Sequence, residues 1–101
     1  MTHIQLLIDL FNQMDDEIEG IKQYATTALK YKQDYPEAAE QMYKLSLQEY
    51  SHYDLLVDAV KKIIESEELD DMEKKLYDYI LDCKAKCHDE AVLCQHKYKN
   101  E

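Results

Sequence analysis

Apolar side chains recur at every third or fourth position along the first third of the chain, which is the spacing of one helix face. The first row comprises Ile4, Leu7, Phe11, Met14, Ile18, Ile21, Ala25 and Ala28. A second row, partly overlapping the first, comprises Leu10, Met14, Ile21, Tyr24, Ala28 and Tyr31. A helix with two apolar rows has more surface to bury than one neighbouring helix covers, so we expect at least a homodimer.

Local signals divide the chain into three helices. Thr2 is typical of a residue that caps the start of a helix. The single proline, Pro36, suits the first position of a second helix, because proline needs no hydrogen-bond partner there. Asp70, followed three residues later by Glu73, predicts the cap of a third helix. The predicted helices cover about residues 3–32, 36–66 and 71–98.

Composition supports an all-helical chain. The 101 residues contain one glycine and one proline, which is too few turn residues for a sheet protein of this size. The short connections favour antiparallel neighbours. We therefore expect an all-α fold, with one domain over residues 1–101 formed by an antiparallel three-helix half-bundle.

Charge and cysteine content narrow the partners and the compartment. With 22 acidic residues against 12 basic ones, the net charge is −10, which disfavours nucleic acid and anionic membranes and favours cations. No stretch reaches the ~18 apolar residues of a membrane span, and the first residues do not form a secretion signal. The three cysteines are odd in number and favour reduced thiols in the cytoplasm.

The apolar row of the second predicted helix is interrupted at its centre by two polar side chains. The row comprises Met42, Leu45, Glu49, His52, Leu56, Ala59 and Ile63. Glu17 similarly interrupts the second row of the first helix. In an antiparallel hairpin that turns near residues 34 and 35, Glu17 lies opposite His52. Because a buried carboxylate is costly unless it is paired or bound, we expect Glu17, Glu49 and His52 to ligate a metal ion such as iron, manganese or zinc.

Other interpretations remain open. Glu49 and His52 could instead form hydrogen bonds at a half-exposed seam, since Glu-x-x-His is a weak motif. Gly20, one turn after Glu17, either leaves room for a metal or partner helix or is a tolerated surface glycine. The predicted core face of the third helix comprises Leu76, Ile80, Cys83, Cys87, Ala91, Cys94 and Tyr98. Cys83, Cys87, His88 or Glu90 could add ligands, although packing is the commoner role of such cysteines, and His88 and His96 are expected on the solvated face.

Residues 10–65 resemble the ferritin-like di-iron carboxylate superfamily, including rubrerythrin-type second helices. The resemblance rests on Glu17 as the single-glutamate ligand and on Glu49-Tyr50-Ser51-His52 as the Glu-x-x-His motif. By this resemblance, Tyr24 is similar to the tyrosine that many ferritins place beside the metal and is expected to take part in catalysis. The implied cofactor is a di-iron centre with Glu49 as bridging carboxylate, and the implied activity is ferroxidase oxidation of Fe(II) by O₂ or peroxide.

The chain departs from the family by having three helices and one Glu-x-x-His motif, where a full bundle has four helices and two motifs. One chain therefore supplies half a centre, as in the encapsulated ferritins, and a two-fold dimer would complete the bundle. An iron-storage role inside an enclosing protein shell follows from the same resemblance. The alternatives are a metal-free helical interaction module, conceivably phage-derived, and a non-catalytic protein that binds metal through its cysteines.

Overall fold

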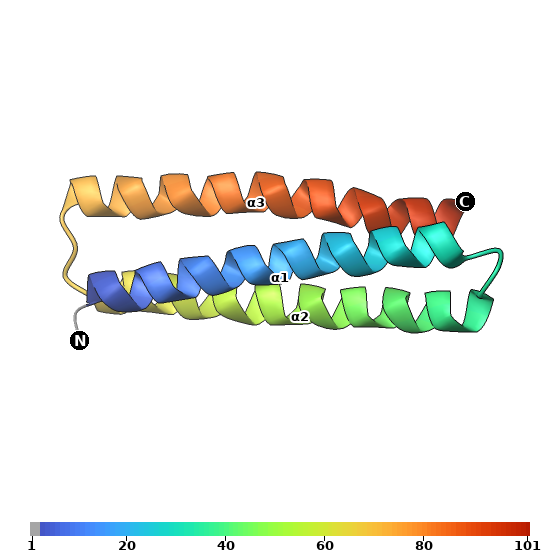
Figure 1. Cartoon of the computed structure of the whole chain (residues 1–101). Helices are drawn as coiled ribbons and strands as arrows, with labels where there is room; N and C mark the ends of the chain where they lie inside the picture. The colour runs from blue at the N-terminus through green and yellow to red at the C-terminus, as the bar shows by residue number, and fades with distance from the viewer. Residues whose placement is uncertain (1–2) are drawn as a thin grey trace.

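Three α-helices joined by two short loops make up the computed structural model, which describes residues 3–101 (Figure 1). They are α1 (His3–Tyr31), α2 (Pro36–Ser66) and α3 (Asp71–Asn100), and each runs antiparallel to the one before it. The all-helical prediction is confirmed, and the helix ends fall within about two residues of those expected from the sequence. The cap predicted at Thr2 lies outside the described residues.

The two later helix starts follow the local signals. Pro36 occupies the first turn of α2, where its missing N–H costs nothing. At the start of α3, the Asp70 carboxylate accepts a hydrogen bond from the backbone N–H of Glu73 at 2.8 Å. This bond satisfies one of the backbone donors that a helix start leaves unpaired, so both boundaries are local properties of the sequence.

The core is centred on α1, which packs along both other helices, whereas α2 and α3 touch each other little. The predicted α1 core row is buried from Leu7 onward: Leu7, Phe11, Met14, Ile18, Ile21, Ala25 and Ala28. Ile4 is exposed, contrary to the prediction. Because three residues fall short of a full helical turn, Ile4 lies to the side of the row that Leu7 begins.

The most buried row of α2 differs from the predicted one. It comprises Ala39, Ser46, Tyr53 and Val60, at a strict seven-residue spacing. The predicted row, which contains Glu49, lies at the edge of the α1–α2 contact and is half-buried, with His52 exposed. The prediction of a core position for Glu49 and His52 is therefore wrong. Because α2 packs against both α1 and α3, its row that contains Tyr53 faces inward. The row that contains Glu49 lies at the open edge of the α1–α2 contact.

The predicted core face of α3 is confirmed only in part, at Ala91 and Tyr98. Cys83 and Cys87 are exposed, and the residues that are buried are Tyr77, His88, Ala91, Gln95 and Tyr98. The inward row is anchored to the other helices by polar contacts. Lys84 Nζ lies 2.6 Å from Asp15 Oδ1 on α1, and the buried Gln95 amide donates a hydrogen bond to Ser46 Oγ on α2 at 3.1 Å. These partners, which lie far away in sequence, decide which side of α3 faces inward.

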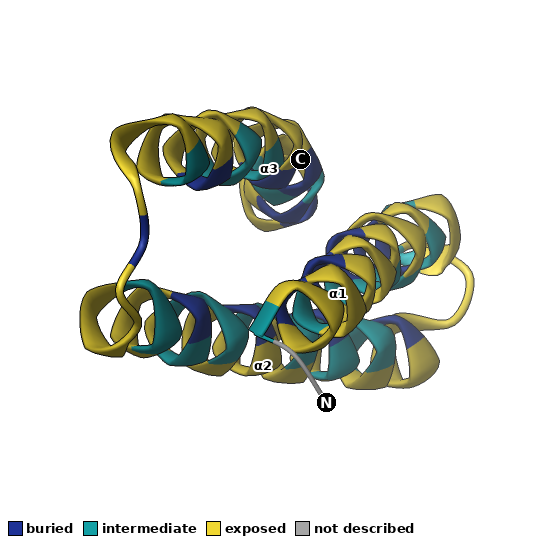
Figure 2. Cartoon of the chain, turned by 90° about the vertical axis from the view of Figure 1, so that its left-hand side faces the viewer, coloured by how far each residue is buried: buried dark blue, intermediate teal, exposed yellow. Residues whose placement is uncertain are grey.

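The three helices form an elongated body of 54 × 22 × 15 Å. Seen along the bundle, α3 lies over one side of the α1–α2 pair, and the opposite side of that pair stays open (Figure 2). Within residues 3–101, no helix combines the length and the apolar content that crossing a bilayer demands.

Candidate metal centre

Three potential ligands from two helices converge near the middle of the molecule. Glu17 comes from α1, and Glu49 and His52 come from successive turns of α2. One ligand atom from each of the three lies within 4.8 Å of the other two, and His52 Nδ1 lies 3.4 Å from Glu17 Oε2. Donor atoms on one ion at ~2.1 Å are separated by up to ~4.2 Å, so small side-chain movements bring these three to ligating distance.

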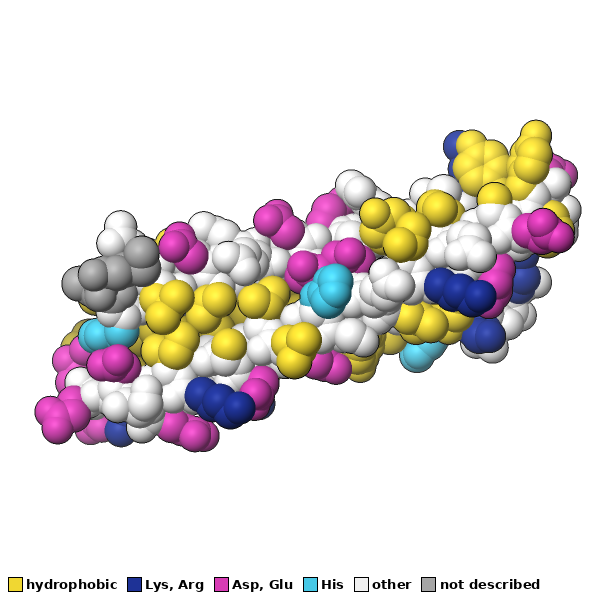
Figure 3. All heavy atoms as spheres, turned by 90° about the horizontal axis from the view of Figure 1, so that it is seen from below, with side chains coloured by type: hydrophobic (Ala, Val, Ile, Leu, Met, Phe, Trp, Pro, Cys, Tyr) yellow, Lys and Arg dark blue, Asp and Glu magenta, His cyan; other side chains and the backbone are white. Residues whose placement is uncertain are grey.

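The site opens to the surface. The Glu17 side chain is 22% exposed and the His52 side chain 54% exposed. Viewed from below, the molecule shows a histidine beside acidic side chains, with hydrophobic side chains on either side of them (Figure 3). On α1, Leu10 and Tyr24 lie one heptad before and after Glu17, and both are half-buried. We call this side of the α1–α2 pair the seam face.

The carboxylates of Glu17 and Glu49 lie close enough to repel each other when both are ionised. A hydrogen bond between the carboxyl of Glu49 and Glu17, partial burial and the negative charge of Glu17 raise the pKa of Glu49 to about 7, and His52 partly opposes this shift. Glu17 Oε2 is buried and accepts no hydrogen bond among the described residues. Two crowded carboxylates, one with a buried oxygen that accepts no hydrogen bond from the described residues, form a site that a cation would stabilise.

Gly20 provides the space that the Glu49 side chain occupies. A Cβ atom at position 20 would lie 2.8 Å from Glu49 Oε2 and about 3 Å from its Cγ and Cδ. The glycine is therefore not an indifferent surface residue, because it leaves room for a side chain of the neighbouring helix α2. Its missing side chain lets Glu49 lie across α1 beside Glu17.

The donor set suits a divalent transition metal. Two carboxylates and one imidazole are typical ligands of iron, manganese and zinc, and three protein ligands leave further coordination positions open. Glu17 and Glu49 would hold the ion through oxygen, and His52 would hold it through a ring nitrogen. Bound iron would supply one-electron redox chemistry, while the carboxylates would balance its charge.

The remaining sequence-predicted candidates lie apart from this group. Among the described residues, the group of potential ligands does not include Cys83, Cys87, His88 or Glu90. The α3 helix presents its cysteines away from the seam face. Tyr24 is half-buried on α1, two turns after Glu17, and forms no hydrogen bond within residues 3–101. Its catalytic role stays a prediction.

A buried histidine was not anticipated from the sequence. His88, expected on the solvated face, is 7% exposed. It stacks on Tyr53 with ring centroids 4.1 Å apart and meets the Tyr50 ring edge-on at 4.7 Å. Its Nε2 has no hydrogen-bond partner among the described residues. The heptad that runs through His88, Ala91 and Gln95 is the signal in the sequence, but it is less apolar than the cysteine row.

His88 should make folding sensitive to acid. Burial lowers the pKa of His88, against the opposing charges of Asp54 and Asp89. Below about pH 6.5, the imidazole takes up a proton in the unfolded chain more readily than in the folded one. The free energy of unfolding therefore decreases as the pH is lowered. When the pH is lowered from 7.5 to 5.5, we expect the thermal midpoint of wild type to fall further than that of His88→Phe.

The exposed His96 supplies the control for this experiment, because His96→Gln alters an imidazole on the same helix without touching the stack. Glu49 titrates in both proteins, so its contribution cancels in the comparison. Parallel pH profiles for wild type and His88→Phe would contradict the assignment of acid sensitivity to His88.

No protein-family model, curated protein or solved structure matches the chain. The functional assignment therefore rests on the arrangement of Glu17, Glu49 and His52 and on the surface around them.

Proposed function

We propose that the chain is a ferritin-like di-iron protein that binds one metal ion per chain through Glu17, Glu49 and His52 and oxidises Fe(II). The convergence of these three ligands, with a buried carboxylate oxygen that accepts no hydrogen bond within residues 3–101, is the observation that carries the proposal. The fold supports it, because the glutamate of α1 and the Glu-x-x-His of α2 come together at one level of an antiparallel hairpin.

Two copies paired through the seam face would complete the centre. One chain offers two carboxylates and one imidazole, so a two-fold pair offers four carboxylates and two imidazoles, the ligand set of a ferritin-like centre. Apolar side chains surround the ligands on this face, including Leu55, which is 68% exposed, and the half-buried Leu10 and Leu56. Burial of these groups would stabilise the pair by about 25 cal/mol per Å² of apolar surface.

The proposed reaction takes one electron from each of two ferrous ions. With O₂ as oxidant, the two electrons and two protons yield hydrogen peroxide; with peroxide as oxidant, they yield water. Fe(II) is here the substrate, and the net charge of −10 favours its approach. Glu17, Glu49 and His52 hold the ions, and Tyr24 is the proposed neighbouring redox side chain.

An anaerobic Fe(II) titration of metal-free protein tests the proposal. We expect saturation at one iron per chain, together with an increase in sedimenting mass as seam faces pair, and then rapid oxidation when O₂ is admitted. Glu17→Gln should abolish saturable binding. The matched control is Glu19→Gln, which removes an exposed carboxylate from the same turn of α1. Unsaturable binding, or equal losses in both variants, would remove the enzyme proposal and leave a metal-free interaction module.

A further inference from the structure

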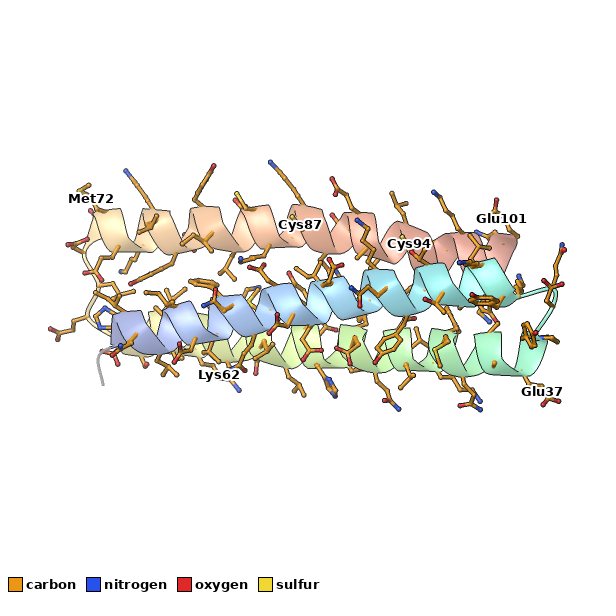
Figure 4. All side chains as sticks on the ribbon, in the orientation of Figure 1. Glu37, Lys62, Met72, Cys87, Cys94 and Glu101 are labelled. Carbon is orange, nitrogen blue, oxygen red and sulfur yellow. The ribbon has the colours of Figure 1, made fainter. Side chains whose placement is uncertain are left out.

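The outer side of α3 carries a row of exposed apolar side chains. Met72, Leu76 and Tyr79 are 82%, 54% and 67% exposed, and Cys83 and Cys87 are exposed as well. Steps of four, three, four and four residues keep all five on one side of the helix, and Cys87 at the end of the row borders the groove between α3 and Ile18 of α1. Met72 lies at the edge of α3 away from α1 and α2 (Figure 4). We call these five residues the outer face of α3.

The inner side of α3 is mixed, because Tyr77, Ala91 and Tyr98 are buried beside polar side chains. It includes Lys84, which pairs with Asp15, the buried His88, and Gln95, which is hydrogen-bonded to Ser46. A helix that packs on one side only normally turns its most apolar row inward. Here a second apolar row stays exposed, which is the arrangement expected of a helix with a second packing partner.

The charge pattern of α3 identifies the partner. The half before residue 84 is mainly acidic, with Asp70, Asp71, Glu73, Asp78 and Asp82 against Lys74 and Lys75. The half from residue 84 onward is the more basic one, with Lys84, Lys86, Lys97 and Lys99 against Asp89, Glu90 and Glu101. An antiparallel copy of the same helix would place acidic half against basic half, whereas a parallel copy would place like charges together.

One antiparallel register satisfies both the apolar row and the charges. If Cys83 lies beside Cys87 of the second copy, then Leu76 lies beside Cys94 at the same offset. In that register, Asp82 and Lys86 of the second copy are offset by about two residues, or ~3 Å along the helix axis. Asp82 and Lys86 form no ion pair within the described part of the chain, so both are available to a partner.

We propose that a second copy of this chain docks antiparallel on the outer face of α3, about a two-fold axis between Cys83 and Cys87. This interface is separate from the seam face and goes beyond the proposed function. A chain with two different two-fold interfaces joins its copies into assemblies larger than a dimer, either as closed rings or as open arrays.

Disulfide trapping tests the register. One variant keeps only Cys83 (Cys87→Ser with Cys94→Ser), and the other keeps only Cys87 (Cys83→Ser with Cys94→Ser). Both are mixed in EDTA and treated with diamide, which takes two electrons and two protons as two thiols join. We expect the mixed Cys83–Cys87 dimer in at least fivefold excess over either variant alone. Predominant like-with-like dimers, or yields equal to those in urea, would overturn the proposal.

Charge exchange tests the same interface without thiol chemistry. Lys86→Asp should raise the dissociation constant of the metal-free dimer at least about tenfold, since it places like charges together around the axis. Adding Asp82→Lys should restore association to within about threefold of wild type. Wild-type protein that stays monomeric in sedimentation at 100 μM would overturn the proposal. Because EDTA is present throughout, neither result depends on the metal site.

Discussion

Replacing Glu49 by glutamine is expected to abolish metal binding and, at the same time, to stabilise the metal-free protein at pH 8. Loss of a ligand should exceed the ~10–100-fold loss of affinity that follows when a residue merely supports a ligand. The gain in stability has a different origin. Glutamine is uncharged, so it removes the repulsion between the carboxylate at position 49 and Glu17 while keeping nearly the same shape.

The sign of the stability effect follows from the pKa of Glu49, which is raised from 4.5 to about 7. Between these values, the unfolded chain has released a proton that the folded chain retains. The folded state of the metal-free protein is therefore destabilised as pH rises above 4.5, and the loss levels off above about pH 7. Glu49→Gln should raise the thermal midpoint at pH 8 by at least about 4 °C and change it little at pH 4.5.

Two measurements check this prediction. Thermal unfolding in EDTA at pH 4.5 and 8 gives the stability change, and calorimetric titration with Mn(II) gives the affinity. Wild-type binding should release a proton near pH 6, which calorimetry in buffers of different ionisation enthalpy detects. Glu19→Gln should leave both quantities unchanged. A variant that binds Mn(II) like wild type, or that is less stable at pH 8, would contradict the assignment of Glu49.

Replacing Gly20 by alanine is expected to displace Glu49 and weaken metal binding while leaving the helices intact. The added Cβ would lie 2.8 Å from Glu49 Oε2, and also close to Cγ and Cδ, so a movement of the carboxylate tip alone does not relieve the contact. Glu49 must adopt another rotamer and leave Glu17. Alanine favours the helix by ~1 kcal/mol over glycine, which offsets part of the overpacking cost.

We expect Gly20→Ala to lower Mn(II) affinity at least about tenfold, or ~1.4 kcal/mol, with the helical content measured by circular dichroism unchanged. Thr26→Ala provides the comparison, because Thr26 is exposed on the same helix. Undiminished affinity in Gly20→Ala would show that Glu49 does not need this space to bind metal. A loss of helical content would instead assign Gly20 to folding.

The predictable part of the structure came from short-range signals. Pro36 and Asp70 act on their own helix ends, so both boundaries could be located without knowing the fold. The opposition of Glu17 and His52 was also predictable, because a hairpin of two straight helices aligns residues by simple counting from the turn. Each of these inferences depends on one helix or on one tight connection.

The orientation of α2 and α3 about their own axes was not predictable in this way. Hydrophobicity favoured the cysteine row of α3, whereas contacts of Lys84 with Asp15 and of Gln95 with Ser46 turn a more polar row inward. Similarly, Glu49 was expected in a core but lies at the open edge of the α1–α2 contact. The role of Gly20 depends on the position of the Glu49 side chain, which comes from α2.

The sequence by itself determined the helical class, the three helix boundaries, the core row of α1 and the level at which the three candidate ligands meet. These properties follow from backbone preferences and from the 3.6-residue period, which act within one helix or across one short turn. Only the tertiary structure decided which faces are buried, how open the site is and which space Glu49 fills. Those properties depend on side chains far apart in sequence, and their partners exist only once the helices have packed.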